Sequence, residues 1–260
     1  MQTQSVCLIT GASSGLGRAL ALQFARSGWQ VVALARSQVL LEQLRLEHAG
    51  IDILPVDLTD SAQLHAATAE LSARYGRLDQ VILNAGTCEY VDAEDLNLGA
   101  FERTFNLNVL AVVACTKAWL PLLQRSSTPR LAIVSSLAHL FPFGRAEAYG
   151  ASKAAISYFA DSLRVDLAHT PIQVCLVEPG FVDTPLTQKN DFPMPFLLSS
   201  TDAASRIYRA LALGSVRLQF PRRLTWSLKL LNLLPYRLRQ QLAARMARQA
   251  QAQSQAESSK

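Results

Sequence analysis

The stretch that decides the fold is Ser5-Val6-Cys7-Leu8-Ile9-Thr10-Gly11-Ala12-Ser13-Ser14-Gly15-Leu16-Gly17. A short apolar run, typical of a buried strand, leads into the spacing G-x-x-x-G-x-G and then into a helical pattern over 15–27. Glycines allow a tight strand-to-helix turn, and the first turn of the helix offers free N–H groups and a positive dipole end to a phosphate. A plain glycine-rich loop is the alternative. The position between strand and helix favours dinucleotide binding.

The rest of the chain repeats this strand-then-helix order. Short runs rich in Val, Ile and Leu alternate with helical patterns, which is typical of βαβ units around a buried parallel sheet. We therefore expect an α/β fold with a doubly wound parallel sheet of about seven strands, helices on both faces and a single domain. The expected strands are 5–10, 30–35, 51–56, 78–83, 130–135, 172–177 and 216–220, and the expected helices are 15–27, 38–48, 61–74, 100–124, 147–168 and 202–212.

The composition fits one domain with a large core in a reducing compartment. The chain has 260 residues, of which 50% are hydrophobic. Its four cysteines form no C-x-x-C pair and its four histidines lack ligand spacing, so we expect neither a disulfide framework nor a metal site. We see no signal peptide, and no apolar run approaches the roughly 20 residues that span a bilayer. These features favour a cytoplasmic protein.

Charge divides the chain near residue 216. Residues 1–216 carry 16 Lys/Arg and 19 Asp/Glu, a net charge of −3, whereas residues 217–260 carry 9 and 1, a net charge of +8. We expect a nucleotide-binding domain over 1–216, a basic amphipathic helical extension over 217–250, and a disordered tail over 251–260, which is rich in Gln, Ser and Ala. No nucleic-acid partner is expected.

The residue after the second expected strand bears on the choice of cofactor. In NAD-binding sites of this kind, an acidic residue here bonds the adenine ribose 2′-OH. In this chain the strand is followed by Arg36, which can pair with a 2′-phosphate through charge-assisted hydrogen bonds, and Arg18 stands just past the glycine turn. Solvated surface arginines are the alternative. We expect NADP(H) rather than NAD(H).

Small and polar residues follow the other expected strands, at the carboxyl edge where open α/β sheets bind ligands. Asn84-Ala85-Gly86 ends the fourth strand, where a small turn lets the backbone approach a ligand. Asn106 and Asn108 lie in an apolar helical stretch, so at least one of them is expected to have a specific partner. Asp57 and Asp60 follow the third strand, and one of them is expected to cap the helix near Ser61. Ser136 follows the fifth strand, and the sixth is followed by Pro179, Gly180, Val182 and Thr184.

Tyr149 and Lys153 form the stretch with the clearest chemistry. Four residues apart on a helix, they lie one turn apart on the same face. A phenol has a pKa of about 10, and a nearby ammonium favours its ionised form and so brings it closer to acid/base work at neutral pH. By itself, a Tyr-x-x-x-Lys pair often lies on a helix without any catalytic role. The surrounding motifs are what support a catalytic role for the pair.

Taken together, these motifs resemble the short-chain dehydrogenase/reductase family over about residues 3–215. Their order is Thr-Gly-x-x-x-Gly-x-Gly, Asn-Ala-Gly, Ser, Tyr-x-x-x-Lys and Pro-Gly. The resemblance implies a Rossmann-like fold, with residues 1–216 as the catalytic domain, and hydride transfer between NAD(P)H and a carbonyl or alcohol. Two positions depart from the family pattern: Leu83 stands where an asparagine is common, and Ala111 where a glycine is common.

The resemblance also implies roles for individual residues. Tyr149 would be the general acid/base, Lys153 would bind the nicotinamide ribose and lower the pKa of Tyr149, and Ser136 would bond the substrate oxygen. Asn108 would support a water-linked proton path from the lysine. The cofactor would be held by Gly11, Ser13, Ser14, Gly15, Leu16 and Gly17 at the phosphate turn, Arg18 and Arg36 at the 2′-phosphate, Asp57 at the adenine, Asn84, Ala85 and Gly86 beside the central strand, and Pro179, Gly180, Val182 and Thr184 along the nicotinamide.

The substrate is less defined by the sequence. The loop after Thr184 contains an apolar run over 192–198, which favours a small hydrophobic ketone, aldehyde or alcohol, although packing on the sheet or on another subunit would use the same residues. His139 and Phe141–Phe143 either border the pocket or are structural. The alternative to an enzyme is a non-catalytic NADP(H)-binding regulator or redox sensor on the same fold.

The basic extension has three candidate roles. Between Pro221 and Pro235, leucines and Trp226 cover a broad helical arc, and arginines follow. Such an element can cover the substrate pocket or form an oligomer interface, in keeping with the homodimers or homotetramers usual in the family. It can also lie peripherally on the inner face of an anionic membrane, or meet an acidic carrier protein.

Overall fold

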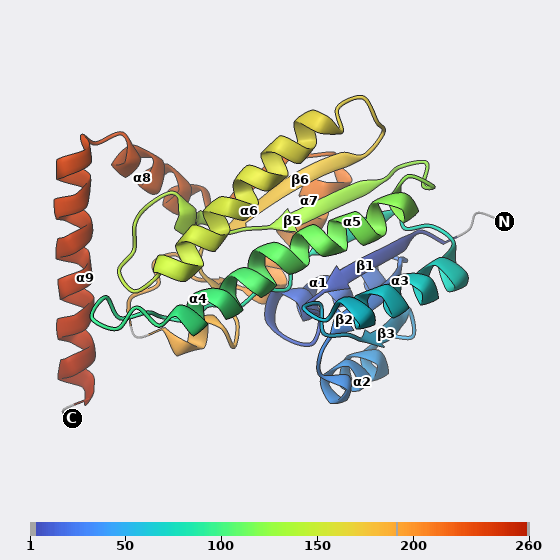
Figure 1. The fold of residues 1–260 in the computed structure, drawn as a ribbon, viewed down its shortest axis with the longest axis horizontal. Coiled ribbons are helices and arrows are strands. Elements are labelled where there is room, and N and C mark those ends of the chain that lie inside the picture. The colour runs from blue at the N-terminus through green and yellow to red at the C-terminus, as the bar shows by residue number, and fades with distance from the viewer. Residues whose placement is uncertain (1–3, 191, 259–260) are drawn as a thin grey trace.

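The computed structural model describes residues 4–190 and 192–258, with side chains as far as residue 247. Seven parallel strands form the central sheet: β1 (Val6–Thr10), β2 (Gln30–Ala35), β3 (Ile51–Pro55), β4 (Gln80–Leu83), β5 (Arg130–Val134), β6 (Gln173–Pro179) and β9 (Arg217–Phe220). Their order is β3-β2-β1-β4-β5-β6-β9. The expected α/β fold with a doubly wound parallel sheet is confirmed, with helices on both faces (Figure 1).

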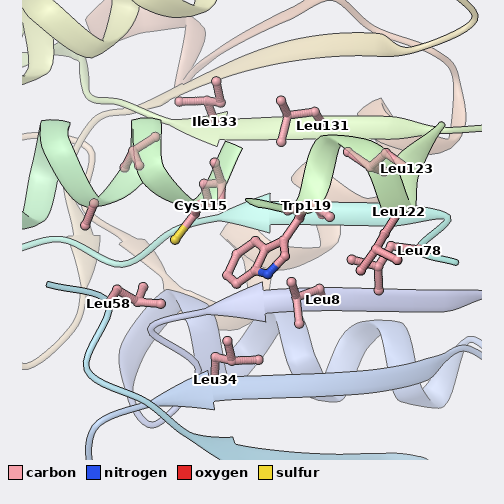
Figure 2. Packing of buried hydrophobic residues seen from close by; sticks show 14 of the residues in the cluster. Leu8, Leu34, Leu58, Leu78, Cys115, Trp119, Leu122, Leu123, Leu131 and Ile133 are labelled. Carbon is pink, nitrogen blue, oxygen red and sulfur yellow. The ribbon is translucent and has the colours of Figure 1, made fainter. Parts of the chain in front are cut away.

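The strands are buried on both sides because their side chains alternate between two helical layers. In β1, Leu8 belongs to one apolar cluster, and Cys7 and Ile9 belong to the other. Figure 2 shows Trp119 lying among the leucines of the first cluster, where it is almost fully buried. The first layer is formed by α3 (Ser61–Tyr75), α5 (Ala111–Leu123) and α6 (Glu147–Asp166), and the second by α1 (Gly15–Arg26), α2 (Gln38–Glu47) and α7 (Ser200–Ala212).

The strand order reverses next to β1. Residues of β1 pair with β2 on one side and with β4 on the other, so that Ile9 lies between Ala33 and Ile82. The connections that leave β1 and β4 therefore run to opposite faces of the sheet and part at its carboxyl edge. A crevice at such a reversal is where open α/β sheets bind ligands.

The helix expected over 100–124 is interrupted in the structure. It consists of α4 (Leu98–Phe105), a π-helical segment η1 (Asn106–Leu110) and α5. A π-turn inserts an extra residue into the helix, and such turns are frequent at functional sites. By length and composition alone, Leu98–Leu123 could cross a membrane, in contrast to the expectation from the sequence. Cys115 and Trp119 are nevertheless buried against the sheet, which is the environment of a core helix.

The C-terminal region departs from two expectations. Arg217–Phe220 forms strand β9 and pairs with β6, as the strand expected over 216–220 implies, so the central sheet includes residues beyond the domain boundary expected at 216. Helix α8 (Arg222–Asn232) follows, and α9 (Tyr236–Ser258) continues through most of the stretch expected to be disordered, 251–260, because alanine and glutamine favour helices. Residues 259–260 lie outside the described part of the chain.

Candidate active site

A cavity of about 590 Å³ opens at the carboxyl edge of the sheet, where the strand order reverses. It brings together residues from the ends of β1, β2, β4, β5 and β6 and from helix α6. Of the candidates from the sequence, Arg18, Asp60, Asn106 and Asn108 are not among its lining residues. The lining includes Gly11, Ser13, Ser14, Gly15, Leu16, Gly17, Arg36, Asp57, Asn84, Ala85, Gly86, Ser136, Tyr149, Lys153, Pro179, Gly180, Val182 and Thr184.

The glycine turn leaves no space for side chains. Gly11 and Gly15 have φ values of 67° and 52°, a left-handed region that favours glycine. A Cβ on Gly17 would collide with the Gly11 carbonyl oxygen and would lie 2.6 Å from Asn84 Nδ2. The close approach of the helix to the strand therefore requires glycine at this position.

Thr10 and Asn84 join the ends of β1 and β4. The Thr10 hydroxyl oxygen accepts hydrogen bonds from the backbone N–H groups of Asn84 and Ala85, both at 3.0 Å. Asn84 Nδ2 in turn donates to the Thr10 carbonyl oxygen at 3.1 Å. The sequence identified Asn84, but Thr10 entered only as part of the glycine motif. Its role as an acceptor emerges from the pairing of two strands 74 residues apart.

The start of α1 fits a phosphate. Ser14 precedes the helix in an extended conformation, and within the described chain no side chain caps its first N–H groups. The first turn also has no acidic residue, so the positive end of the helix dipole is not neutralised locally. Backbone donors, a glycine cradle and a cavity of this size fit the pyrophosphate of a dinucleotide.

Beyond the ends of β2 and β3, the cavity is lined by one exposed arginine and one carboxylate. Arg36 follows β2, lines the cavity and lies near Asp57. Hydrogen bonds from the Thr59 hydroxyl and backbone N–H hold the pKa of Asp57 below its ordinary value, and Arg36 adds to this effect. Asp60, not Asp57, caps α3 by accepting from the backbone N–H of Ala62 and Gln63.

Arg18 lies elsewhere. Its guanidinium pairs with Glu47 at the end of α2, and it does not line the cavity. The structure thus does not bring Arg18 to the cavity, because a carboxylate 29 residues further along the chain engages its guanidinium, and its role at a 2′-phosphate stays a prediction.

Ser136, Tyr149 and Lys153 converge on the far end of the cavity. Ser136 follows β5 at the start of the short 3₁₀-helix η2 (Leu137–His139), and its oxygen accepts from the Ala138 N–H at 3.1 Å. Tyr149 and Lys153 project from α6, with Lys153 Nζ 5.7 Å from the centre of the tyrosine ring. Lys153 Nζ also donates to the Val134 carbonyl oxygen at 3.1 Å.

The pKa values of this pair differ from the expectation. Burial raises the pKa of Tyr149 to about 12, against the opposing effect of a hydrogen bond with Ser136. Burial also lowers the pKa of Lys153 to about 8. The predicted lowering of the Tyr149 pKa by Lys153 is therefore not found, because burial of the phenol dominates. Tyr149 is a protonated donor at neutral pH.

Asn108 lies in the π-helical segment and bonds to Ser152, the residue before Lys153. Its Nδ2 donates to the Thr87 carbonyl oxygen and to Ser152 Oγ, at 2.9 and 3.0 Å, and its Oδ1 accepts from the Thr87 N–H at 2.8 Å. The expectation that one of the two asparagines has specific partners is thus met by Asn108. A Cβ on Gly86 would lie 3.2 Å from Asn108 Oδ1 and 3.5 Å from Lys153 Nζ, so both groups border Gly86.

Two serines that we did not identify from the sequence hold α6 in place. Ser135 Oγ donates to the Lys153 carbonyl oxygen at 2.9 Å and lies 2.7 Å from Ser157 Oγ, which joins the end of β5 to the helix. Ser152 Oγ donates to the Tyr149 carbonyl oxygen at 2.7 Å and links it to Asn108. The sequence gives only a weak indication of these roles, because it does not show which serine hydroxyls near Ser136 and Lys153 are buried.

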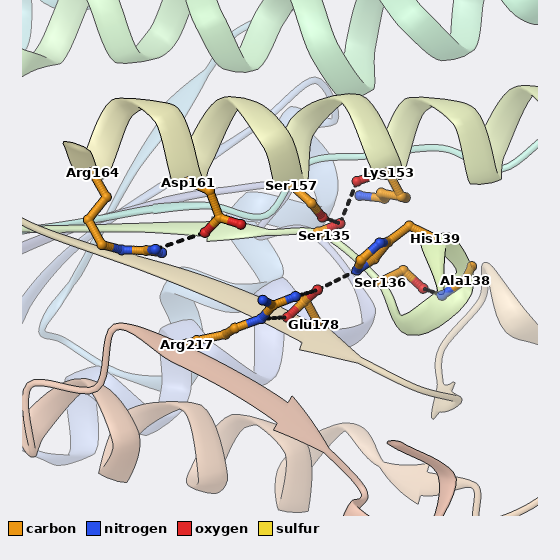
Figure 3. Close-up of polar contacts among 10 residues, drawn as sticks. All are labelled: Ser135, Ser136, Ala138, His139, Lys153, Ser157, Asp161, Arg164, Glu178 and Arg217. Carbon is orange, nitrogen blue, oxygen red and sulfur yellow. Dashed lines mark hydrogen bonds and ion pairs between the residues drawn. The ribbon is translucent and has the colours of Figure 1, made fainter. Parts of the chain in front are cut away.

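A buried carboxylate lies beneath the Ser136 turn. Glu178, near the end of β6, contacts His139 Nε2 and accepts two hydrogen bonds from Arg217 of β9, at 2.6 and 2.9 Å (Figure 3). Phe141 is buried with Leu137 in an apolar cluster against α8. Of the alternatives for 139–143, these contacts favour the structural one.

Three aromatic side chains pack together next to Gly180 and Val182, two residues that line the cavity. Phe192 of the apolar loop packs edge-on against Tyr90 and Phe181, with ring centres 6.2 and 6.1 Å apart. A two-stranded sheet, β7 (Val182–Asp183) with β8 (Leu198–Ser199), closes the base of this loop. Leu224 of α8 lies so near Gly180 that a Cβ there would approach its Cδ2 to 2.6 Å.

Comparison with known proteins agrees with this geometry. The family described as short chain dehydrogenase matches residues 5–193. An uncharacterized oxidoreductase of Myxococcus xanthus is 38% identical over 232 residues, which cover 88% of this chain and 92% of that protein.

Two solved structures share the fold. A short-chain dehydrogenase from Streptomyces avermitilis superposes with a TM-score of 0.80 at 26% identity, covering 88% of this chain and 92% of that one. A short-chain dehydrogenase from Sphingobium yanoikuyae in complex with NADPH gives a TM-score of 0.75 at 26% identity, covering 84% and 88%. The chain therefore belongs to the short-chain dehydrogenase/reductase family and is an oxidoreductase that acts on CH–OH or C=O groups with NAD(P).

Proposed function

We propose that this protein is an NADP(H)-dependent oxidoreductase that reduces the carbonyl group of a small hydrophobic substrate, or oxidises the corresponding secondary alcohol. The observation that carries the proposal is the convergence of Ser136, Tyr149 and Lys153 at one end of the dinucleotide-sized cavity. A protein that only binds the nucleotide has no need of this set.

The chemistry of the proposal follows from these three side chains. A bound nicotinamide supplies or accepts hydride. Ser136 and Tyr149 donate hydrogen bonds to the carbonyl oxygen and stabilise the negative charge that develops on it during reduction. With its pKa raised to about 12, Tyr149 holds its proton at neutral pH and can deliver it to that oxygen. Lys153, fixed by the Val134 carbonyl, would bind the nicotinamide ribose.

Two observations support NADP(H) over NAD(H). Arg36 occupies the position where an acidic residue selects for the ribose 2′-OH, and it is exposed at the cavity. A structural neighbour from Sphingobium yanoikuyae was solved with NADPH. Gly11, Gly15 and Gly17 with the start of α1 would hold the pyrophosphate, and Pro179, Gly180, Val182 and Thr184 would border the nicotinamide.

Hydrophobic side chains at the substrate end support the proposed substrate class. Leu107 and Leu186 line the cavity, and Phe181, which adjoins the lining residues Gly180 and Val182, packs with Phe192. An apolar wall favours ligands that bury carbon surface and present one carbonyl oxygen to Ser136 and Tyr149.

Replacement of Tyr149 by Phe tests the proposal. Loss of the proton donor should lower kcat for NADPH-dependent reduction of a hydrophobic ketone by about 10³-fold, while the Kd for NADPH, measured by fluorescence titration, stays within twofold. Tyr158→Phe is the matched control, because Tyr158 lies on the same helix and is 79% exposed.

Equal turnover by wild type and Tyr149→Phe would refute the assignment. A wild-type protein that binds NADPH yet turns over no ketone, aldehyde or secondary alcohol in a broad screen would instead support the second candidate, a regulator or redox sensor. The full Ser136–Tyr149–Lys153 set favours the enzyme.

We also propose that the protein is cytoplasmic and assembles as a homodimer or homotetramer. Its four cysteines are free, which suits a reducing compartment. Leu110, Val113, Tyr158 and Val165 are exposed apolar side chains on the outer surface of η1, α5 and α6 and support an interface there. Light scattering coupled to gel filtration measures the mass directly.

A further inference from the structure

The outer face of the C-terminal helices is apolar, exposed and bordered by cations. Helix α8 packs its inner face, Leu224 and Leu228, into the apolar cluster beside the Ser136 turn. Trp226 and Leu230 are both 68% exposed and Leu233 is 82% exposed. At the i, i+4, i+7 spacing, these three form one stripe on the opposite side of the helix.

Exposed apolar side chains continue through the turn after α8 and into the first turn of α9. Leu234, Tyr236 and Leu238 are exposed there. Together with Trp226, Leu230 and Leu233 they form what we call the C-terminal apolar face. Such a cluster exceeds the scattered single apolar residues that are normal on a protein surface and indicates an interaction site.

Cations surround this face. By helical geometry, Arg222 and Lys229 flank the stripe on one side and Arg223 on the other, and Arg237 is exposed at the start of α9. Lys229 Nζ lies 5.4 Å from the centre of the Trp226 ring. The sequence has no Asp or Glu from residue 203 to residue 256, and in the described chain none of these cations contacts a carboxylate.

The position of the face relative to the catalytic end is also informative. Figure 1 shows α8 and α9 at the end of the molecule to which the strands' carboxyl ends point. Leu224 touches Gly180, which lines the cavity, and Ala247 of α9 would approach a Cβ on Gly144, between Ser136 and Tyr149, to 3.1 Å. Helix α8, which carries most of this face, therefore packs against a segment that lines the cavity.

We propose that the C-terminal apolar face docks on an anionic phospholipid bilayer, peripherally and without spanning it. An amphipathic helix with exposed Trp and Leu on its outer face and basic residues on both borders fits the boundary between acyl chains and acidic headgroups. A second copy of this chain fits less well, because a symmetric interface would bring the same cations together. The apolar side chains would enter the acyl boundary while the arginines and Lys229 contact phosphate groups.

Flotation of the full chain with vesicles tests this docking. Wild type should float with phosphatidylcholine vesicles that contain about 30% phosphatidylglycerol, weakly or not at all with phosphatidylcholine alone, and less as salt is raised. Leu230→Ser with Leu233→Ser should lower binding by at least about tenfold, since two leucines lose their burial in lipid. Arg222→Gln with Lys229→Gln should lower binding to the anionic vesicles and reduce its salt dependence.

Controls make the outcome decisive. Leu46→Ser and Leu213→Ser, at positions 84% and 85% exposed outside this face, should bind as wild type does, and unchanged thermal unfolding of every variant shows that the fold is kept. Absence of wild-type binding to anionic vesicles overturns the proposal, as does equal binding by the double leucine variant. A wild-type oligomer that Leu230→Ser with Leu233→Ser dissociates would assign the face to a second copy, and wild type that binds an acidic carrier protein but no vesicle would assign it to that partner.

Discussion

The carboxylate of Glu178 lies fully buried against the imidazole of His139, and this contact joins the end of strand β6 to the turn that carries Ser136. Burial by itself raises the pKa of Glu178, but hydrogen bonds from His139 and Arg217 outweigh it and hold the pKa below its ordinary value. The carboxylate is thus charged at neutral pH. It ties strand β6, strand β9 and the turn after Ser136 together.

Glu178→Gln should loosen this junction. The amide presents N–H donors to partners that are themselves donors, so we expect a loss of about 1.5–3 kcal/mol in the free energy of unfolding. We also expect a lower kcat with little change in the Kd for NADPH, because Ser136 loses its support. Asp161→Asn is the control, since its ion pair with Arg164 is partly solvent-exposed and should cost under about 0.5 kcal/mol. Denaturant unfolding and steady-state kinetics measure both effects, and a Glu178→Gln protein as stable as wild type would contradict the role.

Arg36→Glu should change the cofactor preference. A carboxylate repels a 2′-phosphate and can accept from a 2′-OH, so KM for NADPH should rise at least about tenfold while KM for NADH stays level or falls. Arg18→Gln should leave the NADPH/NADH ratio unchanged, because Arg18 pairs with Glu47. Kinetics with both cofactors decide the matter. If Arg36→Glu leaves the ratio within twofold, Arg36 does not select the cofactor.

Gly86→Ala should impair catalysis more than folding. The added methyl group would lie 3.2 Å from Asn108 Oδ1 and 3.5 Å from Lys153 Nζ, so it crowds two groups that border the site. We expect kcat to fall about tenfold or more. In Gly150→Ala the nearest atom to the new Cβ is the Ala138 carbonyl oxygen at 3.8 Å, so that change should leave kcat intact and, in a helix, stabilise by about 0.5–1 kcal/mol. Equal kcat values for the two variants would show that space beside Gly86 is not limiting.

Alkaline pH should destabilise the protein. Burial raises the pKa of Cys115 and Cys175 from 9.0 to about 12, and that of Cys88 to about 11. Above pH 9 the unfolded chain loses thiol protons that the folded chain keeps, so stability that is fully present below pH 9 is lost as the pH rises toward 12. Lys153, with its pKa lowered to about 8, has the opposite effect but is a single group.

Each such thiol contributes a slope of about 1.4 kcal/mol per pH unit above pH 9. The free energy of unfolding, measured in urea from pH 8 to pH 11, should therefore fall steeply beyond pH 9. Cys115→Ala should show a shallower fall than wild type. A flat profile across this range would mean that the thiols ionise in the folded protein.

The sequence was sufficient to predict those features that are determined by residues close together in the chain. The glycine turn, the alternation of apolar runs with helical patterns, and the Tyr149–Lys153 spacing all act within a few residues. The sheet, the tight turn into the first helix and the position of Tyr149 and Lys153 on one helix could therefore be predicted. The position of Arg36 could be predicted in the same way, because Arg36 directly follows strand β2. The order and spacing of these motifs are what made the family resemblance specific.

Contacts between distant segments decided the rest. The partner of Arg18 is 29 residues away, and those of Glu178 lie 39 residues before and after it, so no local pattern reveals that one arginine leaves the cavity and that a strand carboxylate supports Ser136. The raised pKa of Tyr149 depends on how much protein covers the phenol, and the sequence shows only that a lysine follows one turn later. The sequence predicted an apolar helical pattern at α8. Which apolar residues are buried was decided by packing: Leu224 and Leu228 lie in the core, whereas Trp226, Leu230 and Leu233 are exposed.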